Sequence, residues 1–525
     1  MRLSLRVMRR LDRIFVLSQQ KRLEVGAVLE HQAVQDIKSW PVAGLTGRRK
    51  ILTPVTEITK DNLLDVLEKA MYVHAKNAAE IEYLWNYYKG SQDIQFKQKY
   101  VRDLINEKVT VNRANEIVSF KSAFLLEEPI QYISHGGSET VSKLVNSLND
   151  MMRAAGKEAS DKELVDWFHI CGVAPRLAIA DPENEDVPFA IYSLDPRKAF
   201  AIYHDGIGEK ALAGVTLGTN ESGELTKDVY TRNAHYFVVG NSVTLLSTPQ
   251  YDGVPLVEYI NNAARMGAFE GVISILNNIN LLESNAVDSV EDFVNGFDVF
   301  ENCEIDDGDY SKLAIGGNAV KVKTTSPGLP ARVYRVSSEI NQSGVQTRID
   351  DLTDAYLEIC GMPNRNGGTS TSDTGTAVIF RDGWSTAVSR AKDTETLFRR
   401  SEREFCRIVL NICKVNGVKV PKLSEFEPEF LAHKLSNLQS RVQALCEMLN
   451  NPKIHPKHAY NAAGSGVFDD VEAAYRDGMK WMEETQAKEE AALNARLTDG
   501  EEETASNERL VNGDGTNDTG TVQTG

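Results

Sequence analysis

This 525-residue sequence lacks the common motifs of catalysis and of nucleotide or calcium binding. It has no HExxH zinc-protease motif, no GxSxG nucleophile elbow, no GxxxxGK phosphate loop and no EF-hand loop. Each absence removes the reaction or binding class that the spacing of that motif supports. We therefore assign no catalytic residue, no metal ligand and no cofactor from the sequence, and we expect a protein that is not an enzyme.

Cysteine is scarce and long apolar runs are missing. The six cysteines form no CxxC pair and have no histidine at zinc-ligand spacing, which favours reduced core residues in a reducing compartment. Arginines interrupt the N-terminal stretch MRLSLRVMRRLDRIFVLSQQ, and no segment approaches the roughly 20 apolar residues that a membrane helix needs. We expect neither a secreted nor a membrane-spanning chain.

Basic residues are also fewer than acidic residues. The chain has 58 Lys and Arg against 75 Asp and Glu, a formal net charge of −17 at pH 7. Proteins that grip phosphates regardless of sequence normally present a basic face, so strong DNA binding by one chain is disfavoured. The hydrophobic fraction of 42% and the charged fraction of 25% are values of a globular protein. This length predicts about three to four domains or subdomains.

The N-terminal half combines helices with a sheet. Apolar residues recur at helical spacing over 61–88, 112–126, 139–155 and 161–168, and Asp61 is the expected N-cap of the first helix. Pro129 ends the second helix, and a strand is expected at 130–134. Short β-branched and aromatic segments separated by Gly, Pro, Asp and Asn then predict an antiparallel sheet of about six strands over 174–247.

The C-terminal half is mainly helical. Two helices, 266–294 and 338–360, flank a β-rich insert over 297–336. The stretch NRNGGTSTSDTG, Asn364–Gly375, follows; because loops of this length between ordered helices tend to be functional, we expect a functional loop. The longest helix is predicted over 376–414, and helical tail segments over 434–449 and 467–486. From residue 487 the composition predicts disorder.

Four features leave alternatives open. An acidic cluster in the insert could hold a hard cation, or form a solvated or partner-facing surface. Three aspartates before the loop could be an ordinary solvated helix face. The HGGS turn at His135 resembles an oxyanion hole but has no nucleophile elbow to serve. The basic residues 1–50 could be an arm or an artefact of upstream translation.

Three segments carry a resemblance to a known family. They are INEKVTVNRANEIVSFKSAFLLEEPIQY, then VPLVEYINNAARMGAFEGVISILNNINLLESNAVDSVEDFVNGFDVF, then YLEICGMPNRNGGTSTSDTGTAV before a long helix. In this order they resemble the portal proteins of tailed bacteriophages, typified by siphophages of Gram-positive hosts, over residues 51–449. The chain departs from the family pattern at Glu127 and Glu128, before Pro129, and at Thr374–Val378 after the loop.

The resemblance implies an α+β portal-type subunit with an α/β wing, a two-helix stem, a small α/β clip, a long wing helix and a helical crown. The implied parts are a basic N-terminal extension (1–50), the first part of the wing (51–262), stem helix 1 (263–296), the clip (297–336), stem helix 2 (337–361), the tunnel loop (362–375), the long wing helix (376–420), the crown (421–486) and a disordered acidic tail (487–525).

The resemblance also implies a function. Subunits would form a ring, a homododecamer, at the portal vertex of the virion after assembly in the host cytoplasm, and double-stranded DNA would be packaged and ejected through its channel. Implied partners are the large terminase subunit, the major capsid and scaffolding proteins, and the head-tail connector (adaptor) proteins, with no membrane. The alternative is another phage head-completion or scaffold protein without a channel. A hydrolase that uses His135 or the acidic cluster is a more remote third.

Residue roles follow from the same resemblance. The tunnel loop would surround DNA in the channel with Asn364, Arg365, Asn366, Gly367, Gly368, Ser370, Thr371 and Ser372. Stem helix 2 would line the channel with Asp350, Asp351 and Asp354. The clip would meet its partners with Glu301, Glu304, Asp306, Asp307 and Asp309. Subunits of net charge −17 would give the ring an acidic wall, which repels phosphates and lets DNA slide.

Overall fold

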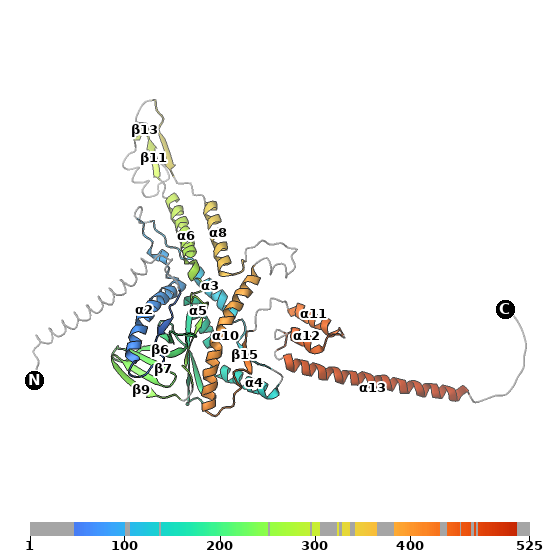
Figure 1. Cartoon of the computed structure of the whole chain (residues 1–525). Coiled ribbons are helices and arrows are strands. Elements are labelled where there is room, and N and C mark those ends of the chain that lie inside the picture. The colour runs from blue at the N-terminus through green and yellow to red at the C-terminus, as the bar shows by residue number, and fades with distance from the viewer. Residues whose placement is uncertain are drawn as a thin grey trace, which may run out of the picture. The chain divides into compact units, whose positions relative to one another are not determined.

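The computed structural model consists of two units, Met1–Ala432 and His433–Gly525. The first unit mixes helices and sheets, and the described part of the second is helical (Figure 1). The structure describes residues 47–99, 105–135, 138–249, 252–294, 297–304, 323–324, 328–336, 342–364, 383–430, 438–451, 453–463, 467–468 and 471–511. Within these ranges, no helix is both long and apolar enough to cross a membrane.

The helices of the first unit follow the apolar spacing of the sequence. Those predicted over 61–88, 112–126 and 139–155 are confirmed to within two residues. Asn62, not Asp61, is the N-cap of the first helix, whereas Asn112 caps the second by accepting a hydrogen bond from the N–H of Asn115 at 3.2 Å. The helices are α2 (Leu63–Tyr88), α3 (Arg113–Leu125), α4 (Glu139–Ala154), α5 (Lys157–Cys171), α6 (Ile273–Val294), α8 (Gln342–Cys360) and α10 (Trp384–Val415), with 3-10 turns η2 (Asp93–Phe96) and η3 (Glu270–Val272).

The strands form two main sheets, so the prediction of a single antiparallel sheet is wrong. The six-stranded sheet has the order β1-β5-β6-β7-β8-β9 and the three-stranded sheet the order β10-β3-β4. In these two sheets β1 pairs in parallel with β5, and all other neighbouring strands are antiparallel. The strands are β1 (Ile51–Thr53), β3 (Val173–Ala180), β4 (Phe189–Ser193), β5 (Ala199–His204), β6 (Ala211–Thr219), β7 (Leu225–Thr231), β8 (His235–Val239), β9 (Ser242–Ser247) and β10 (Leu256–Ile260).

Burial explains the division into two sheets. Six successive residues at the start of β3 are buried, so this strand is covered on both faces and shows no alternation that would assign it to a half-exposed sheet. The strand β7 was not predicted, because its sequence LTKDVYT has polar residues at most of its partly exposed positions. Its pairing with β6 and β8 completes the larger sheet.

The folded part of the chain includes residues 47–50, which were assigned to an N-terminal extension. The Arg48 side chain is fully buried, with Nη2 2.6 Å from Glu270 and Nε 3.1 Å from Glu80. Gly47 has φ +88°, and a Cβ there would lie 1.8 Å from the carbonyl oxygen of Ala264. The remaining residues of the proposed extension, 1–46, lie outside the described part.

The helix α10 packs along the interior of the first unit. Its residues Phe398, Phe405 and Val409 are buried in one cluster with Phe168 of α5 and Phe189 of β4. The short strands β2 (Gln131–Ser134), which confirms the strand predicted at 130–134, and β15 (Phe426–Glu429) pair antiparallel and contribute to the same cluster. This packing fixes the C-terminal half of α10, from Phe398 to Cys413, over roughly 23 Å at 1.5 Å per residue.

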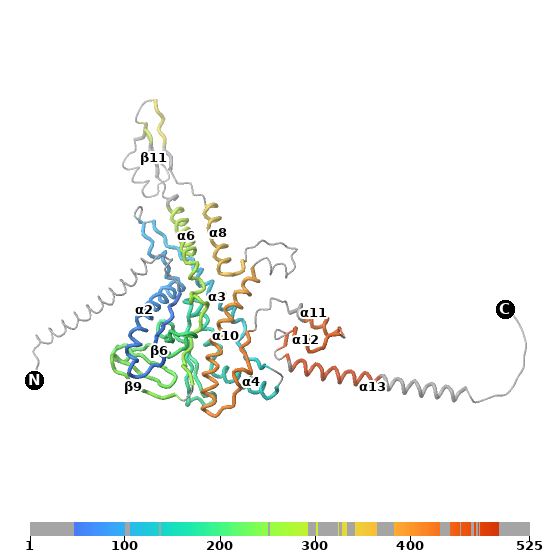
Figure 2. The backbone as a smooth tube through the Cα atoms, viewed as in Figure 1, coloured from blue at the N-terminus to red at the C-terminus, as the bar shows by residue number. Residues whose placement is uncertain are grey.

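The helices α6 and α8 lie side by side (Figures 1 and 2). A second cluster joins Leu276 and Ile279 of α6 to Ile349 and Tyr356 of α8. The two helices are connected through a β module, as the predicted helix, insert, helix order requires. Its described strands are β11 (Phe297–Glu301), β12 (Cys303–Glu304), β13 (Lys323–Thr324) and β14 (Arg332–Val336).

Another face of α6 binds an extended segment through polar side chains. The N–H groups of Glu107, Val109 and Val111 donate to Asp288, Ser284 and Asn280, at 2.7, 3.0 and 2.8 Å. Two residues of extended chain and four residues of helix both advance about 6 Å, so the two repeats stay in register. The apolar stripe predicted for this helix therefore accounts for only one of its two buried faces.

The second unit contains α11 (Leu438–Leu449), α12 (Pro456–Ala463) and α13 (Val471–Val511). The helices predicted over 434–449 and 467–486 are confirmed over 438–449 and 471–486, whereas residues 467–468 are not helical and α12 was not predicted. The prediction of disorder from residue 487 needs correction, because α13 continues to Val511. The segment QAKEEAALNARL is rich in Ala, Glu, Lys and Leu, which have high helix propensity even where nothing packs on them.

The cysteines fit the prediction of reduced core residues with one exception. Four of those described are free and buried, but Cys446 of α11 is exposed. Burial raises the pKa of the Cys171 thiol to about 12 and that of Cys360 to about 11, which keeps both as neutral thiols at pH 7.

Candidate functional site

The helix α8 presents an acidic face. Asp350, Asp351 and Asp354 are all exposed, and Glu358 adds a fourth exposed carboxylate one turn further on. At roughly 100° per residue these four side chains lie within an arc of about 100°. The structure therefore brings together the three predicted aspartates and adds one acidic residue that was missed, although its spacing from Asp354 could have indicated it.

The contacts of these carboxylates leave the face negatively charged. Gln346 donates to Asp350, and Asn364 donates to Asp354, each at 2.8 Å. Arg348 reaches Asp351 only at 4.0 Å, in an exposed pair that water and salt screen. Because Ile349, Tyr356, Leu357 and Cys360 are buried on the other side of α8, its packing fixes the direction of the acidic face.

The predicted tunnel loop is described only at its two ends. Gly361 ends α8 with φ +65°; its N–H bonds to the carbonyl of Glu358 and the N–H of Met362 to that of Leu357, at 3.0 and 2.8 Å. Gly383, with φ +82°, precedes α10. Of the predicted DNA-contacting residues, Asn364 is described. The others lie outside the described residues: Arg365, Asn366, Gly367, Gly368, Ser370, Thr371 and Ser372.

The predicted clip surface is described in part. Glu301 is exposed at the end of β11 and is in register with Arg332 of β14, and Glu304 is in register with Lys323. Asp306, Asp307 and Asp309 lie outside the described residues. Among the residues that are described, no group of three His, Cys, Asp or Glu could hold a metal ion.

The HGGS turn begins as an ordinary strand connection. The N–H of His135 donates to the carbonyl of Glu425 at 2.7 Å, so it is not free to bind an oxyanion. The exposed imidazole lies 3.6 Å from the carboxylate of Glu427. These contacts extend the pairing of β2 with β15, and Gly136 and Gly137 lie outside the described residues.

A basic face of α10 escaped the sequence analysis, which followed only the apolar period of this helix. The face carries five exposed cations within an arc of about 80° at roughly 100° per residue: Lys392, Arg400, Arg403, Arg407 and Lys414. Arg407 pairs with Glu404 at 2.8 Å. Counting charges by helical face, as well as apolar residues, could have found it.

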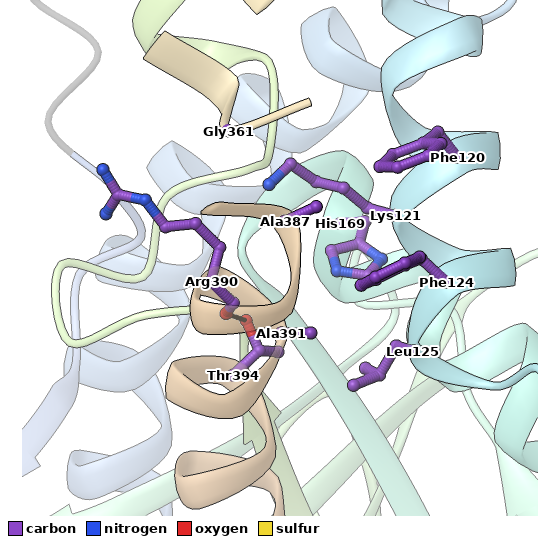
Figure 3. Close-up of a pocket in the computed structure, with 10 residues that line it drawn as sticks. All are labelled: Phe120, Lys121, Phe124, Leu125, His169, Gly361, Ala387, Arg390, Ala391 and Thr394. Atoms are coloured by element: carbon purple, nitrogen blue, oxygen red, sulfur yellow. Dashed lines mark hydrogen bonds between the residues drawn. The ribbon is translucent and has the colours of Figure 1, made fainter. Parts of the chain in front are cut away.

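A cationic cavity lies where α3, the end of α8 and α10 meet. Figure 3 shows Lys121 of α3 lying over His169 of α5 and reaching toward Gly361, with Arg390 extending from α10. Burial holds the pKa of His169 well below its usual value, and the nearby Lys121 lowers it further. Its Nδ1 lies 3.0 Å from the Ser122 hydroxyl. Burial also lowers the pKa of Lys121, and Arg390 adds to this effect, although Cys360 opposes it.

Comparison with known families gives a match over most of the chain. The model of the family described as phage portal protein, SPP1 Gp6-like, matches residues 67–487. Among solved structures, a chain of "Neck of empty GTA particle computed with C6 symmetry" is similar at a TM-score of 0.40 and 10% identity, over 67% of this chain and 89% of that chain. No curated protein matches. The helix, insert, helix, loop and long-helix order agrees with the family match, and the chain belongs to the SPP1 Gp6-like family of phage portal proteins.

Proposed function

We propose that the protein is a portal vertex subunit, and that its copies form a closed dodecameric ring around a DNA channel in the phage capsid. One observation carries this proposal beyond family membership: the paired helices α6 and α8 present an acidic α8 face and lead directly into the loop before α10. Asp350, Asp351 and Asp354 of twelve such faces would give the channel a negatively charged wall, which repels phosphates and leaves DNA free to slide.

The parts of the fold are assigned accordingly. The sheets and helices over 51–262 form the wing, α6 and α8 the stem, the β module over 297–336 the clip, α10 the long wing helix, and the helices of the second unit the crown. The loop over 362–375 is the tunnel loop, in which Arg365 contributes the fixed positive charge and Gly367 and Gly368 the backbone freedom. Ser370, Thr371 and Ser372 offer hydroxyl donors to phosphate oxygens.

The charge distribution supports assembly into a ring. A cyclic ring needs two different complementary faces on each subunit, because its interfaces are heterologous. Besides the acidic α8 face assigned to the channel, each chain has the basic face of α10, a surface of opposite sign that can meet acidic residues of a neighbouring copy. Complementary potentials of this kind fix the order of association and suppress wrong pairings.

The partners follow from the position of each part. The clip would dock the large terminase subunit during packaging and the head-tail connector proteins afterwards, through Glu301, Glu304, Asp306, Asp307 and Asp309. The wing would face the major capsid and scaffolding proteins. The protein would therefore act in the host cytoplasm during assembly and in the virion afterwards.

Mass photometry and negative-stain microscopy of the purified chain test this function. We expect assemblies of about twelve subunits with a central hole, although rings of a recombinant chain can close with another number. A chain that stays monomeric at micromolar concentration would contradict the proposal. Closed particles without a hole would favour the alternative of a head-completion or scaffold protein.

A further inference from the structure

A cavity of about 350 Å³ opens beside the C-terminal end of α8. Its polar wall comes from three elements: Lys121 of α3, the loop residues Asn261 and Asn262, and Arg390 and Thr394 of α10. Ile359 and Cys360, from the last turn of α8, supply part of its apolar wall. Polar and apolar groups contribute to its lining in similar measure, and a concave site with a few convergent polar groups is a typical ligand site.

The cavity has an excess of positive charge. Lys121 is half-buried and Arg390 exposed at the rim, and within the described part of the chain neither of the two cationic side chains has a hydrogen-bonding or ion-pair partner. Asp393, the one acidic residue among those lining the cavity, is exposed. The neighbouring His169 is neutral because burial lowers its pKa, so it adds no charge of its own. A desolvated ammonium without a counter-ion is unfavourable, and an anion in the cavity would remove this penalty.

The backbone of α8 leaves room for Arg390 to lie across this end of the cavity. A Cβ on Gly361 would approach Cγ of Arg390 to 2.8 Å, so a larger residue there would displace the arginine. Gly361 also has φ +65°, which a side chain would strain. Gly361 therefore both ends α8 and leaves room for the side chain of Arg390.

We propose that this cavity is a carboxylate site that Glu358 of the neighbouring subunit fills in the assembled ring, an inference that rests on the proposed function. The chain is rich in carboxylates, with 75 acidic against 58 basic residues, so an acidic side chain of a second copy is the anion most available to it. Arg390 can bind a carboxylate through two parallel N–H bonds, and Lys121 supplies a second positive charge from inside.

The position of Glu358 on α8 fits an interface between unlike faces. At roughly 100° per residue, Glu358 points about 150° away from the mean direction of Ile359 and Cys360, which line the cavity of the same subunit. One copy can therefore offer its Glu358 on one side and its cavity on the other. A ring requires this head-to-tail arrangement.

Ring symmetry adds a condition that Glu358 meets. Rotation about the axis keeps every atom at constant height along that axis, so a side chain and the cavity it enters in the next copy must lie at nearly equal height within one subunit. Glu358 and the cavity residues Ile359 and Cys360 belong to the same helical turn. The other acidic residues of the α8 face lie one to two turns away.

Charge-reversal variants test the proposed contact between Glu358 and the cavity of the neighbouring subunit. Glu358→Lys and Arg390→Glu should each raise the concentration at half-assembly by about tenfold or more, as for loss of one close interfacial charge pair. The double variant Glu358→Lys/Arg390→Glu should recover most of this loss. Glu68→Lys, an equal charge change at an exposed position of α2, is the matched control and should assemble as wild type.

A second variant separates assembly from folding. Lys121→Met removes the desolvated charge, so the unassembled chain should melt at the same or a higher temperature while ring formation weakens. If Glu358→Lys assembles as well as wild type, the proposed contact is wrong, but the proposed ring still stands. If the wild-type chain itself forms no rings, the proposed function is contradicted. If inorganic phosphate stabilises the unassembled wild type but not Arg390→Glu, and Glu358→Lys rings form normally, the cavity holds a free anion and the neighbour contact is wrong.

Discussion

The hydroxyl of Tyr259 donates a hydrogen bond to Glu402, with 2.6 Å between Oη and Oε2, in the interior of the first unit. Tyr132 donates to the other carboxylate oxygen, and the Nζ of Lys157 lies 3.1 Å from it. Glu402 and Arg176 are both fully buried. Burial alone would raise the pKa of Glu402, but Lys157 and Arg176 hold it below its usual value. The carboxylate of Glu402, on α10, is thus the common partner of residues from α5 and three different strands.

Replacing Glu402 with Gln should destabilise the folded chain by about 3 to 5 kcal/mol, because Lys157 and Arg176 would remain buried with one carboxylate fewer. Urea unfolding of the unassembled chain measures this. Glu404→Gln, at an exposed position two residues away that pairs with Arg407, is the control and should unfold close to wild type. Equal midpoints for both variants would show that the buried network contributes little.

The same carboxylate predicts a pH dependence. Since the pKa of Glu402 is lower in the folded chain than its ordinary value of 4.5, its contribution to the stability of the fold is fully present above pH 4.5. It is lost as the pH falls through the folded pKa. The stability difference between wild type and Glu402→Gln should therefore shrink below pH 4.5 and stay constant between pH 6 and 8, within about 0.5 kcal/mol. A difference that grows on acidification would contradict the assigned direction.

Arg48→Met should destabilise the first unit by about 3 to 5 kcal/mol, since it leaves Glu80 and Glu270 buried with fewer cationic partners. Burial already raises the pKa of Glu270. Lys50→Met removes a partly exposed pair with Glu209 and serves as the control. We expect a large loss in the urea midpoint for the first variant and little for the second. Similar midpoints would mean that residues 47–50 are not an essential part of the fold.

Proline at Gly367 and Gly368 should leave rings and procapsids intact but lower DNA packaging or retention. The reason is that the proposed tunnel loop must change shape as DNA advances, and proline fixes φ near −65°. Packaged DNA protected from nuclease is the measurement, and alanine at both positions is the milder comparison. Failed assembly would indicate a structural connection between subunits, and packaging at the wild-type level would indicate a loop without a role; either result contradicts the tunnel-loop assignment.

Reversing the charges of the clip should weaken docking of the large terminase subunit without affecting ring formation. The physical reason is that charged residues at the rim of an interface mainly determine the salt-sensitive rate of association. The residues to be reversed are Glu301, Glu304, Asp306, Asp307 and Asp309. Binding kinetics at two salt concentrations measure the effect. Reversal of Glu183, Glu185 and Asp186, exposed acidic residues of the β3–β4 connection, is the control. Unchanged association of the clip variant would place the docking surface elsewhere.

Much of the first unit could be predicted from the sequence, because it depends on interactions between residues close together in the chain. The period of apolar residues placed α2, α3 and α4, because one stripe of a helix must be buried and the stripe repeats every 3.6 residues. The same period placed Asp350, Asp351 and Asp354 on one polar face of α8, and the order of helices, insert and loop indicated the family. These features depend on residues close together in the chain.

The tertiary structure decided what depends on residues far apart. Nothing near Glu402 in the sequence shows that this charged residue is buried, because its partners Tyr132, Lys157 and Arg176 come from other elements. The division into two sheets depends on which strands pair, and Lys121 and Arg390 line one cavity only because α3 and α10 pack beside the end of α8. Burial free energy and backbone pairing choose among such distant contacts, and neither is a property of a short stretch of sequence.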